Sequence, residues 1–160
     1  MIIPKHFVLD LDGVFTDGSF HYSKSGKAYK VFGPDDHDAI LQISKIISVQ
    51  VVTADTTGFD ISRKRIESDM GLSLTLVPAR SRAIELSKML DLSSCIYMGD
   101  GIFDSLVFKE VFYSIAPANS LYQTRVSASF VTQSRGGDRA VAEACLHIAQ
   151  KFFNLDLINS

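Results

Sequence analysis

The sequence has few of the residues that mark special classes of protein. It contains two cysteines, Cys95 and Cys145, whose number and spacing match neither a metal-binding motif nor a disulfide framework. We expect both to be buried, reduced thiols, as is typical of a cytoplasmic protein. Glycine and proline are sparse, with 10 and 4 residues among 160, which excludes collagen-like and disordered chains.

A large excess of one charge and long apolar runs are also lacking. The 16 lysines and arginines nearly balance the 18 aspartates and glutamates, giving a formal net charge of −2, so nothing calls for a nucleic acid partner. No apolar run approaches the roughly 20 residues of a membrane-spanning helix, and the first motif leaves no room for a cleavable signal. We expect a cytoplasmic protein without membrane partners, folded as one domain over residues 1–160.

Short apolar runs alternate with helical patterns along the chain. Runs of strand length lie at residues 7–9, 49–53, 74–77, 95–98, 113–116 and 130–132. Helical spacing joins Ile40, Ile43 and Ile47, and it returns at 141–152, where we expect Asp138 to cap the helix. This alternation predicts an α/β fold, a three-layer Rossmann-like parallel sheet with helices on both faces.

One segment, residues 19–32, breaks the alternation. Aromatic and β-branched residues stand on both sides of Ser25-Gly26. This pattern predicts a β-hairpin inserted after the first strand.

Polar residues stand where three of the predicted strands end. Asp10 and Thr53 end the first two strands, and Asp100 follows the strand at 95–98. Because ligands of parallel sheets bind beyond the carboxyl ends of the strands, these residues predict an active site at that edge.

Two acidic motifs surround these positions. The first is Asp-Leu-Asp-Gly-Val-Phe-Thr-Asp-Gly at 10–18, and the second is Gly-Asp-Gly-Ile-Phe-Asp at 99–104. Gly13 lets the chain turn, so that Asp10 and Asp12 can share a task. Mg²⁺ prefers one or two carboxylates together with water and substrate phosphate. Asp10 and Asp100 on adjacent strands would provide those carboxylates.

In this order the two motifs resemble the haloacid-dehalogenase superfamily. The resemblance implies that Asp10 is a nucleophile that becomes phosphorylated, and that Asp12 is the general acid and later the general base. It also implies that Mg²⁺ is held by Asp10, the backbone carbonyl of Asp12 and Asp100. Asp104 would support this metal site from behind.

The superfamily has two further phosphate-binding positions. Thr53 matches the strand-ending Thr or Ser that binds a phosphoryl oxygen. No Lys stands at the other position, so we expect Arg80 or Arg82 to offset the phosphate charge, with a planar fork in place of a point charge.

The hairpin, the lack of an inserted cap domain and the Gly-Gly-Asp-Arg-Ala-Val stretch at 136–141 are similar to one branch of the superfamily. This branch holds the 3-deoxy-manno-octulosonate 8-phosphate phosphatases and the phosphatase-like domain of some acylneuraminate cytidylyltransferases. The resemblance implies a homotetramer in which a neighbouring subunit helps to close each site. It also makes Asp36, which matches a motif Asp of the branch, and Arg139 candidate substrate-binding residues.

Two departures from the branch bear on the substrate. Ala54-Asp55 replaces a Gly-Arg pair, and Asp35 replaces an Arg. Acidic groups would repel the carboxylate of a sugar acid. This favours a neutral or amino sugar phosphate, or a differently decorated nonulosonate phosphate, unless these acids are surface charges or helix caps.

Two other classes of protein remain open. The missing Lys favours a weak or inactive relative, an oligomerisation or regulatory module linked to acylneuraminate-type sugar activation. Retention of the acidic set argues against it. A phosphate-accepting receiver module also gathers aspartates at strand ends, but its acidic pair is normally adjacent, which disfavours it here.

Overall fold

The core of the protein is a six-stranded sheet in the order β5-β4-β1-β6-β7-β8, in which every pairing is parallel. This computed structural model describes residues 3–159. The strands are β1 (His6–Asp10), β4 (Ser48–Thr53), β5 (Ser73–Leu76), β6 (Cys95–Met98), β7 (Tyr113–Ala116) and β8 (Phe130–Val131). All six predicted strands are therefore present.

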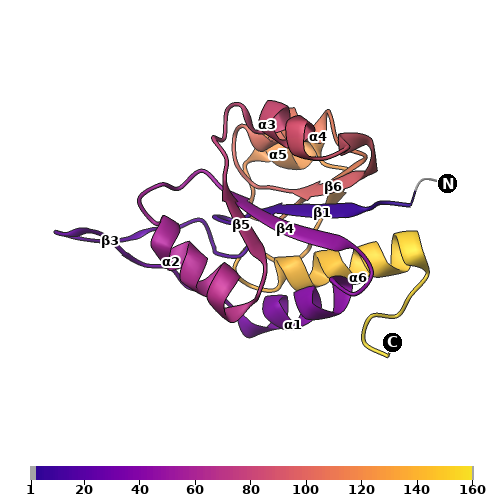
Figure 1. The fold of residues 1–160 in the computed structure, drawn as a ribbon, viewed down its shortest axis with the longest axis horizontal. Helices are drawn as coiled ribbons and strands as arrows, with labels where there is room; N and C mark the ends of the chain where they lie inside the picture. Colours follow the sequence, from indigo (N-terminus) through magenta and orange to yellow (C-terminus); the bar gives the residue numbers. More distant parts are fainter. Residues whose placement is uncertain (1–2, 160) are drawn as a thin grey trace.

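Helices cover both faces of the sheet (Figure 1). The helices are α1 (Pro34–Ile43), α2 (Phe59–Arg63), α3 (Arg82–Met89), α4 (Asp104–Phe108), α5 (Tyr122–Ser127) and α6 (Ala140–Phe153), with a π-helical turn η1 (Lys64–Asp69) after α2 and a 3₁₀ turn η2 (Leu92–Ser94) before β6. One face carries α1, α2 and α6, and the other carries α3, α4 and α5 (Figure 1). The predicted three-layer α/β architecture is confirmed.

Strand β1 shows why the central strands of the sheet have continuous apolar sequences. Phe7 and Leu9 face the layer of α1 and α6, while Val8 faces the other layer, and all three are 0% exposed. Successive side chains of a strand point to opposite faces, so a strand covered on both sides must be apolar throughout. Each such side chain contributes about 1.5–3 kcal/mol by leaving water.

The predicted hairpin is formed by β2 (His21–Ser23) and β3 (Gly26–Tyr29), which pair antiparallel. It projects from the edge of the molecule beyond the strand ends (Figure 1). Gly26 has a φ of 107°, which glycine adopts without steric cost. Within residues 3–159 no cap domain is inserted between the strands.

The start of α6 differs from the prediction. Arg139, in the left-handed region with a φ of 71°, is the N-cap residue, and no side chain at that position caps the helix. Instead, the Asp36 carboxylate on α1 accepts a hydrogen bond from the N–H of Ala142 at 2.9 Å. The expectation that Asp138 caps this helix is therefore wrong, because a neighbouring helix supplies the acceptor.

The turn before α6 packs backbone to backbone against the loop that follows β1. The N–H of Gly137 donates to the carbonyl of Val14 at 3.1 Å. A Cβ atom on Gly136 would overlap the carbonyl oxygen of Gly13. The last helix is thus joined directly to the first acidic motif.

In the described part of the chain, no helix has both the length and the apolar character needed to cross a membrane.

Candidate active site

The three central strands bring polar residues to one edge of the sheet. Asp10 is the last residue of β1 and Thr53 the last of β4, and Asp100 lies two residues beyond β6. Strands β4 and β6 flank β1, and all run in the same direction. These residues are far apart in the sequence, and the topology of the sheet brings them together.

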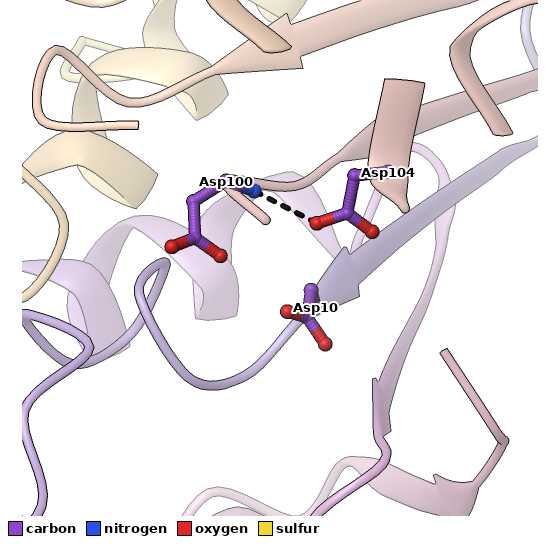
Figure 2. Close-up of side chains that lie close together, drawn as sticks. All are labelled: Asp10, Asp100 and Asp104. Atoms are coloured by element: carbon purple, nitrogen blue, oxygen red, sulfur yellow. Dashed lines mark hydrogen bonds between the residues drawn. The ribbon is translucent and has the colours of Figure 1, made fainter. Parts of the chain in front are cut away.

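Three carboxylates form a cluster at this edge (Figure 2). One oxygen from each of Asp10, Asp100 and Asp104 lies within 4.8 Å of the others. Asp104 also orders the turn of the second motif, because its Oδ2 accepts hydrogen bonds from the N–H groups of Asp100 at 2.9 Å and Gly101 at 2.8 Å. Asp104 therefore lies behind Asp100 and fixes its backbone.

The electrostatics of the cluster favour a bound cation. Burial, with the neighbouring carboxylates, raises the pKa of Asp10 well above its usual range and that of Asp100 to about 7. Both causes penalise the ionised form. A divalent cation with a preference for oxygen ligands would offset this penalty, so the residues present fit Mg²⁺.

Gly13 makes room for the Asp100 carboxylate. Its φ is +88°, and a Cβ atom at this position would overlap the Asp100 side chain. Its N–H donates to Thr16 Oγ1 at 3.2 Å, which stabilises the turn. The glycine of the first motif is thus required by the aspartate of the second.

Arg82, and not Arg80, enters the cluster. Its Nη1 donates to Asp10 Oδ1 at 2.8 Å, to Asp104 Oδ1 at 3.1 Å and to the hydroxyl of Tyr97 at 2.8 Å. Although burial alone would lower the pKa of Arg82, the surrounding Tyr97, Asp10 and Asp104 raise it, so the side chain stays charged. Arg80 is exposed, with its guanidinium 6.0 Å from the ring of Phe103.

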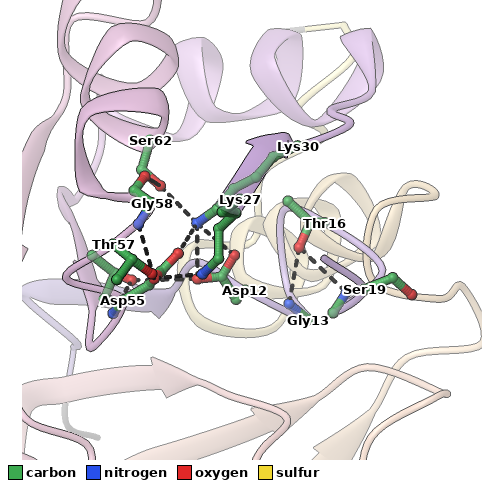
Figure 3. Close-up of polar contacts among 12 residues, drawn as sticks. Asp12, Gly13, Thr16, Ser19, Lys27, Lys30, Asp55, Thr57, Gly58 and Ser62 are labelled. Atoms are coloured by element: carbon green, nitrogen blue, oxygen red, sulfur yellow. Dashed lines mark hydrogen bonds and ion pairs between the residues drawn. The ribbon is translucent and has the colours of Figure 1, made fainter. Parts of the chain in front are cut away.

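The Asp12 side chain lies apart from the three-carboxylate cluster. Its Oδ2 accepts from Thr53 Oγ1 at 3.4 Å. It also accepts from Lys30 Nζ at 3.0 Å (Figure 3). Thr53 Oγ1 also accepts the N–H of Asp55 at 3.1 Å. The first motif therefore presents two carboxylates with different partners, Asp10 toward Arg82 and Asp12 toward Lys30.

Two lysines of the hairpin segment reach the site, and sequence reasoning missed both. Lys27 Nζ lies 2.5 Å from Asp55 Oδ1, and Lys30 Nζ lies 2.9 Å from Asp55 Oδ2 (Figure 3). The expected repulsion by Asp55 is therefore offset inside the chain. The only signal in the sequence is a pair of lysines three residues apart in a predicted hairpin, and it does not say where the hairpin folds.

An open cleft of about 380 Å³ lies over these residues. It is lined by Asp10, Asp12, Phe20, Lys27, Thr53, Ala54, Asp55, Ala79, Arg82, Gly101, Ile102, Phe103 and Asp104. The lining therefore combines charged side chains with aromatic and aliphatic ones.

Asp36 and Arg139 do not line this cleft. Asp36 is 2% exposed between α1 and α6, where it caps α6. Arg139 Nε donates to Asp35 Oδ2 at 2.7 Å on the surface. Within one chain, neither residue reaches the carboxylate cluster, and their roles in substrate binding stay a prediction.

Comparison with known proteins gives a consistent set of relatives. No family model matches the chain. The 3-deoxy-D-manno-octulosonate 8-phosphate phosphatase KdsC of Haemophilus influenzae is 29% identical over 146 residues, which cover 87% of this chain and 79% of the relative.

Solved structures of such phosphatases share the fold. The cobalt-bound enzyme from Haemophilus influenzae aligns with a TM-score of 0.80 and 28% identity, over 92% of this chain and 88% of that one. The enzyme from Moraxella catarrhalis, in complex with magnesium ion, phosphate ion and KDO, aligns with a TM-score of 0.85 and 25% identity, over 98% and 91%.

Proposed function

The chain is a haloacid-dehalogenase-like protein of the capless branch that resembles the 3-deoxy-D-manno-octulosonate 8-phosphate phosphatases, and we propose that it is a Mg²⁺-dependent phosphatase acting on a sugar phosphate. The observation that carries the proposal is the cluster of Asp10, Asp100 and Asp104 at the strand ends, with Arg82 in contact. A relative of the same fold holds magnesium and phosphate.

In the first step, a carboxylate oxygen of Asp10 attacks the phosphorus atom. The bond between phosphorus and the ester oxygen breaks, and the leaving oxygen takes a proton from Asp12. The alcohol departs and Asp10 carries the phosphoryl group. Thr53 donates a hydrogen bond to a phosphoryl oxygen.

In the second step, water attacks the phosphorus atom and gives its proton to the Asp12 carboxylate. The bond between phosphorus and Asp10 breaks, which releases inorganic phosphate and restores both aspartates. Arg82 remains charged throughout and offsets the negative charge around Asp10.

Asp10, Asp100 and the backbone carbonyl of Asp12 would hold Mg²⁺, with Asp104 supporting Asp100. The bound cation supplies positive charge that lets an anionic nucleophile approach a phosphate dianion.

The cleft favours a leaving group that carries no second anion. Its two lining cations, Lys27 and Arg82, already contact carboxylates of the same chain. Phe20, Ile102 and Phe103 offer apolar surface instead. We therefore favour a neutral or amino sugar phosphate, or a nonulosonate phosphate whose carboxylate is met by a neighbouring subunit.

The proposal is tested by release of p-nitrophenol from p-nitrophenyl phosphate with Mg²⁺ and after chelation. We expect turnover by wild type only with the metal, and losses of at least about 100-fold in Asp10→Asn and Asp12→Asn. Wild-type turnover no greater than that of either variant would instead favour the oligomerisation or regulatory module. A screen of sugar phosphates for phosphate release then identifies the substrate.

The same proposal includes a homotetramer. The hairpin segment exposes Phe20, Tyr22 and Tyr29 at 43%, 68% and 56%, and it projects beside an open cleft. Aromatic residues on an exposed projection are suited to contacts between subunits.

A further inference from the structure

Lys30, directly after β3, has a buried ammonium group. Its side chain is 0% exposed, and a buried charge persists only when it is paired. Its Nζ lies 2.8 Å from Asp12 Oδ1, 3.0 Å from Asp12 Oδ2, 2.9 Å from Asp55 Oδ2 and 2.8 Å from Ser62 Oγ (Figure 3). Lys30 donates hydrogen bonds to Asp12 Oδ2 and Ser62 Oγ, and its contacts with Asp12 Oδ1 and Asp55 Oδ2 are ion pairs.

Two of these residues hold the ammonium in place. The hydroxyl of Ser62 donates to the carbonyl of Gly58 at 3.0 Å, so its lone pairs face Lys30. Asp55 is fixed in turn by Lys27 and by the N–H of Gly58 at 3.0 Å. Although burial alone would raise the pKa of Asp55, bonds from Lys27 and Lys30 hold it below its usual range. Asp55 is therefore a fixed anion inside the chain.

The third residue, Asp12, has few other restraints. Apart from Lys30, its carboxylate contacts only Thr53 among the hydrogen bonds and ion pairs of residues 3–159, and that bond is long at 3.4 Å. Rotation of the side chain would break the contacts of the carboxylate with Lys30 and Thr53. Contact with both oxygens of Asp12 is what prevents this rotation.

We propose that Lys30 is a positioning residue that aims the Asp12 carboxyl group at the leaving-group oxygen, with Ser62 and Asp55 as its anchors. This inference rests on the proposed function, in which Asp12 protonates the leaving group. The hairpin then has a role within one chain, because Lys30, which follows β3, orients Asp12.

The test compares two phosphate monoesters that differ in their need for an acid. The p-nitrophenolate anion leaves without protonation, whereas the alkoxide of glucose 6-phosphate does not. The measured quantity is kcat/KM, which reports only the steps up to phosphorylation of Asp10 when that step is irreversible. In Lys30→Met we expect kcat/KM to fall at least about tenfold more for glucose 6-phosphate than for p-nitrophenyl phosphate.

Lys27→Met is the matched control, because Lys27 also fastens the hairpin to Asp55 but does not contact Asp12. Because Lys27 acts on Lys30 only through Asp55, we expect Lys27→Met to change the ratio of the two kcat/KM values much less than Lys30→Met does. Ser62→Ala removes one anchor of the ammonium. It should change the ratio of kcat/KM for glucose 6-phosphate to kcat/KM for p-nitrophenyl phosphate in the same direction as Lys30→Met, by a smaller factor. It serves as the test if Lys30→Met does not fold.

Equal losses on both esters in Lys30→Met, or in Ser62→Ala where it is used, would overturn the inference while leaving the phosphatase intact. The same holds if Lys27→Met changes the ratio as much as Lys30→Met. Wild type without metal-dependent turnover of either ester would overturn the proposed function, and the inference with it.

Discussion

At position 13 the first motif passes so close to the second that a side chain has no space. We predict that Gly13→Ala displaces the Asp100 carboxylate and lowers Mg²⁺-dependent turnover at least about tenfold. The matched control is Gly71→Ala, because Gly71 also has a positive φ of 69° but an added Cβ atom would meet nothing within 4 Å. That variant should lose about 1 kcal/mol of stability and keep its activity. Equal activity of the two variants would contradict the prediction.

Arg82 gives a second prediction at this scale. Arg82→Met leaves Asp10, Asp104 and the Tyr97 hydroxyl buried without their cation, so we expect the metal-free protein to lose about 3 kcal/mol in urea unfolding. Arg80→Met, on the surface, should change stability by less than about 0.5 kcal/mol. Equal stabilities would show that the buried contacts of Arg82 are dispensable.

Most of the residues at the cleft can be identified from the sequence, whereas their partners cannot. Asp10, Asp12 and Asp100 stand out because they follow short apolar runs and lie close to glycine. The choice between Arg80 and Arg82 depends on which side of the turn before α3 faces β1, and one sequence does not state this. Lys30 was missed because its contact with Asp12 depends on how the hairpin folds back.

The cap of α6 shows a similar limit at the level of elements. Local rules consider residues next to the helix, and they favour Asp138. The acceptor comes from Asp36, 106 residues away in sequence. Helix α5 is also fixed by distant groups, since Thr124 Oγ1 donates to the carbonyl of Gly101 at 2.8 Å. Strands covered on both faces are predicted more easily, because their apolar runs are continuous.

Asp36 predicts how stability depends on pH. Burial raises its pKa to about 6 from 3.8. The folded protein therefore binds more protons than the unfolded chain between these values, and stability from this group is present below about pH 4 and lost as pH rises through about 6. The loss is on the order of 3 kcal/mol.

We therefore expect Asp36→Asn, which can still accept from Ala142, to gain stability relative to wild type between about pH 4 and pH 8. Unfolding in urea at several pH values measures this difference. Asp138→Asn, a side chain 64% exposed, serves as the control and should show no such trend. A constant difference between Asp36→Asn and wild type would contradict the assignment.

For the molecule as a whole, metal binding should stabilise the folded state. Mg²⁺ at about 100 times its Kd should add about 2.7 kcal/mol to the free energy of unfolding, because the carboxylate cluster exists only in the folded chain. We expect Asp100→Asn to abolish most of this gain in thermal unfolding, and Asp60→Asn on the surface to retain it. A gain of equal size in both variants would place the ion elsewhere.

The proposed tetramer gives a prediction at the same scale. Light scattering should report four copies of the 17.6 kDa chain, and the pair Tyr22→Glu and Tyr29→Glu on the hairpin should reduce that mass. Ile158→Glu, at a side chain 77% exposed near the C-terminus, is the control. A wild-type mass of 17.6 kDa would exclude the tetramer.

The contact between Gly136-Gly137 and the loop after β1 limits where the chain tolerates changes in length. An insertion at the tip of the hairpin, beside Gly26, would extend into solvent. An extra residue between Gly136 and Gly137 would push on Val14 and so shift the aspartates of the first motif, although these lie far away in sequence. Designers who graft loops or permute this scaffold therefore have to treat the entry to α6 as part of the candidate active site.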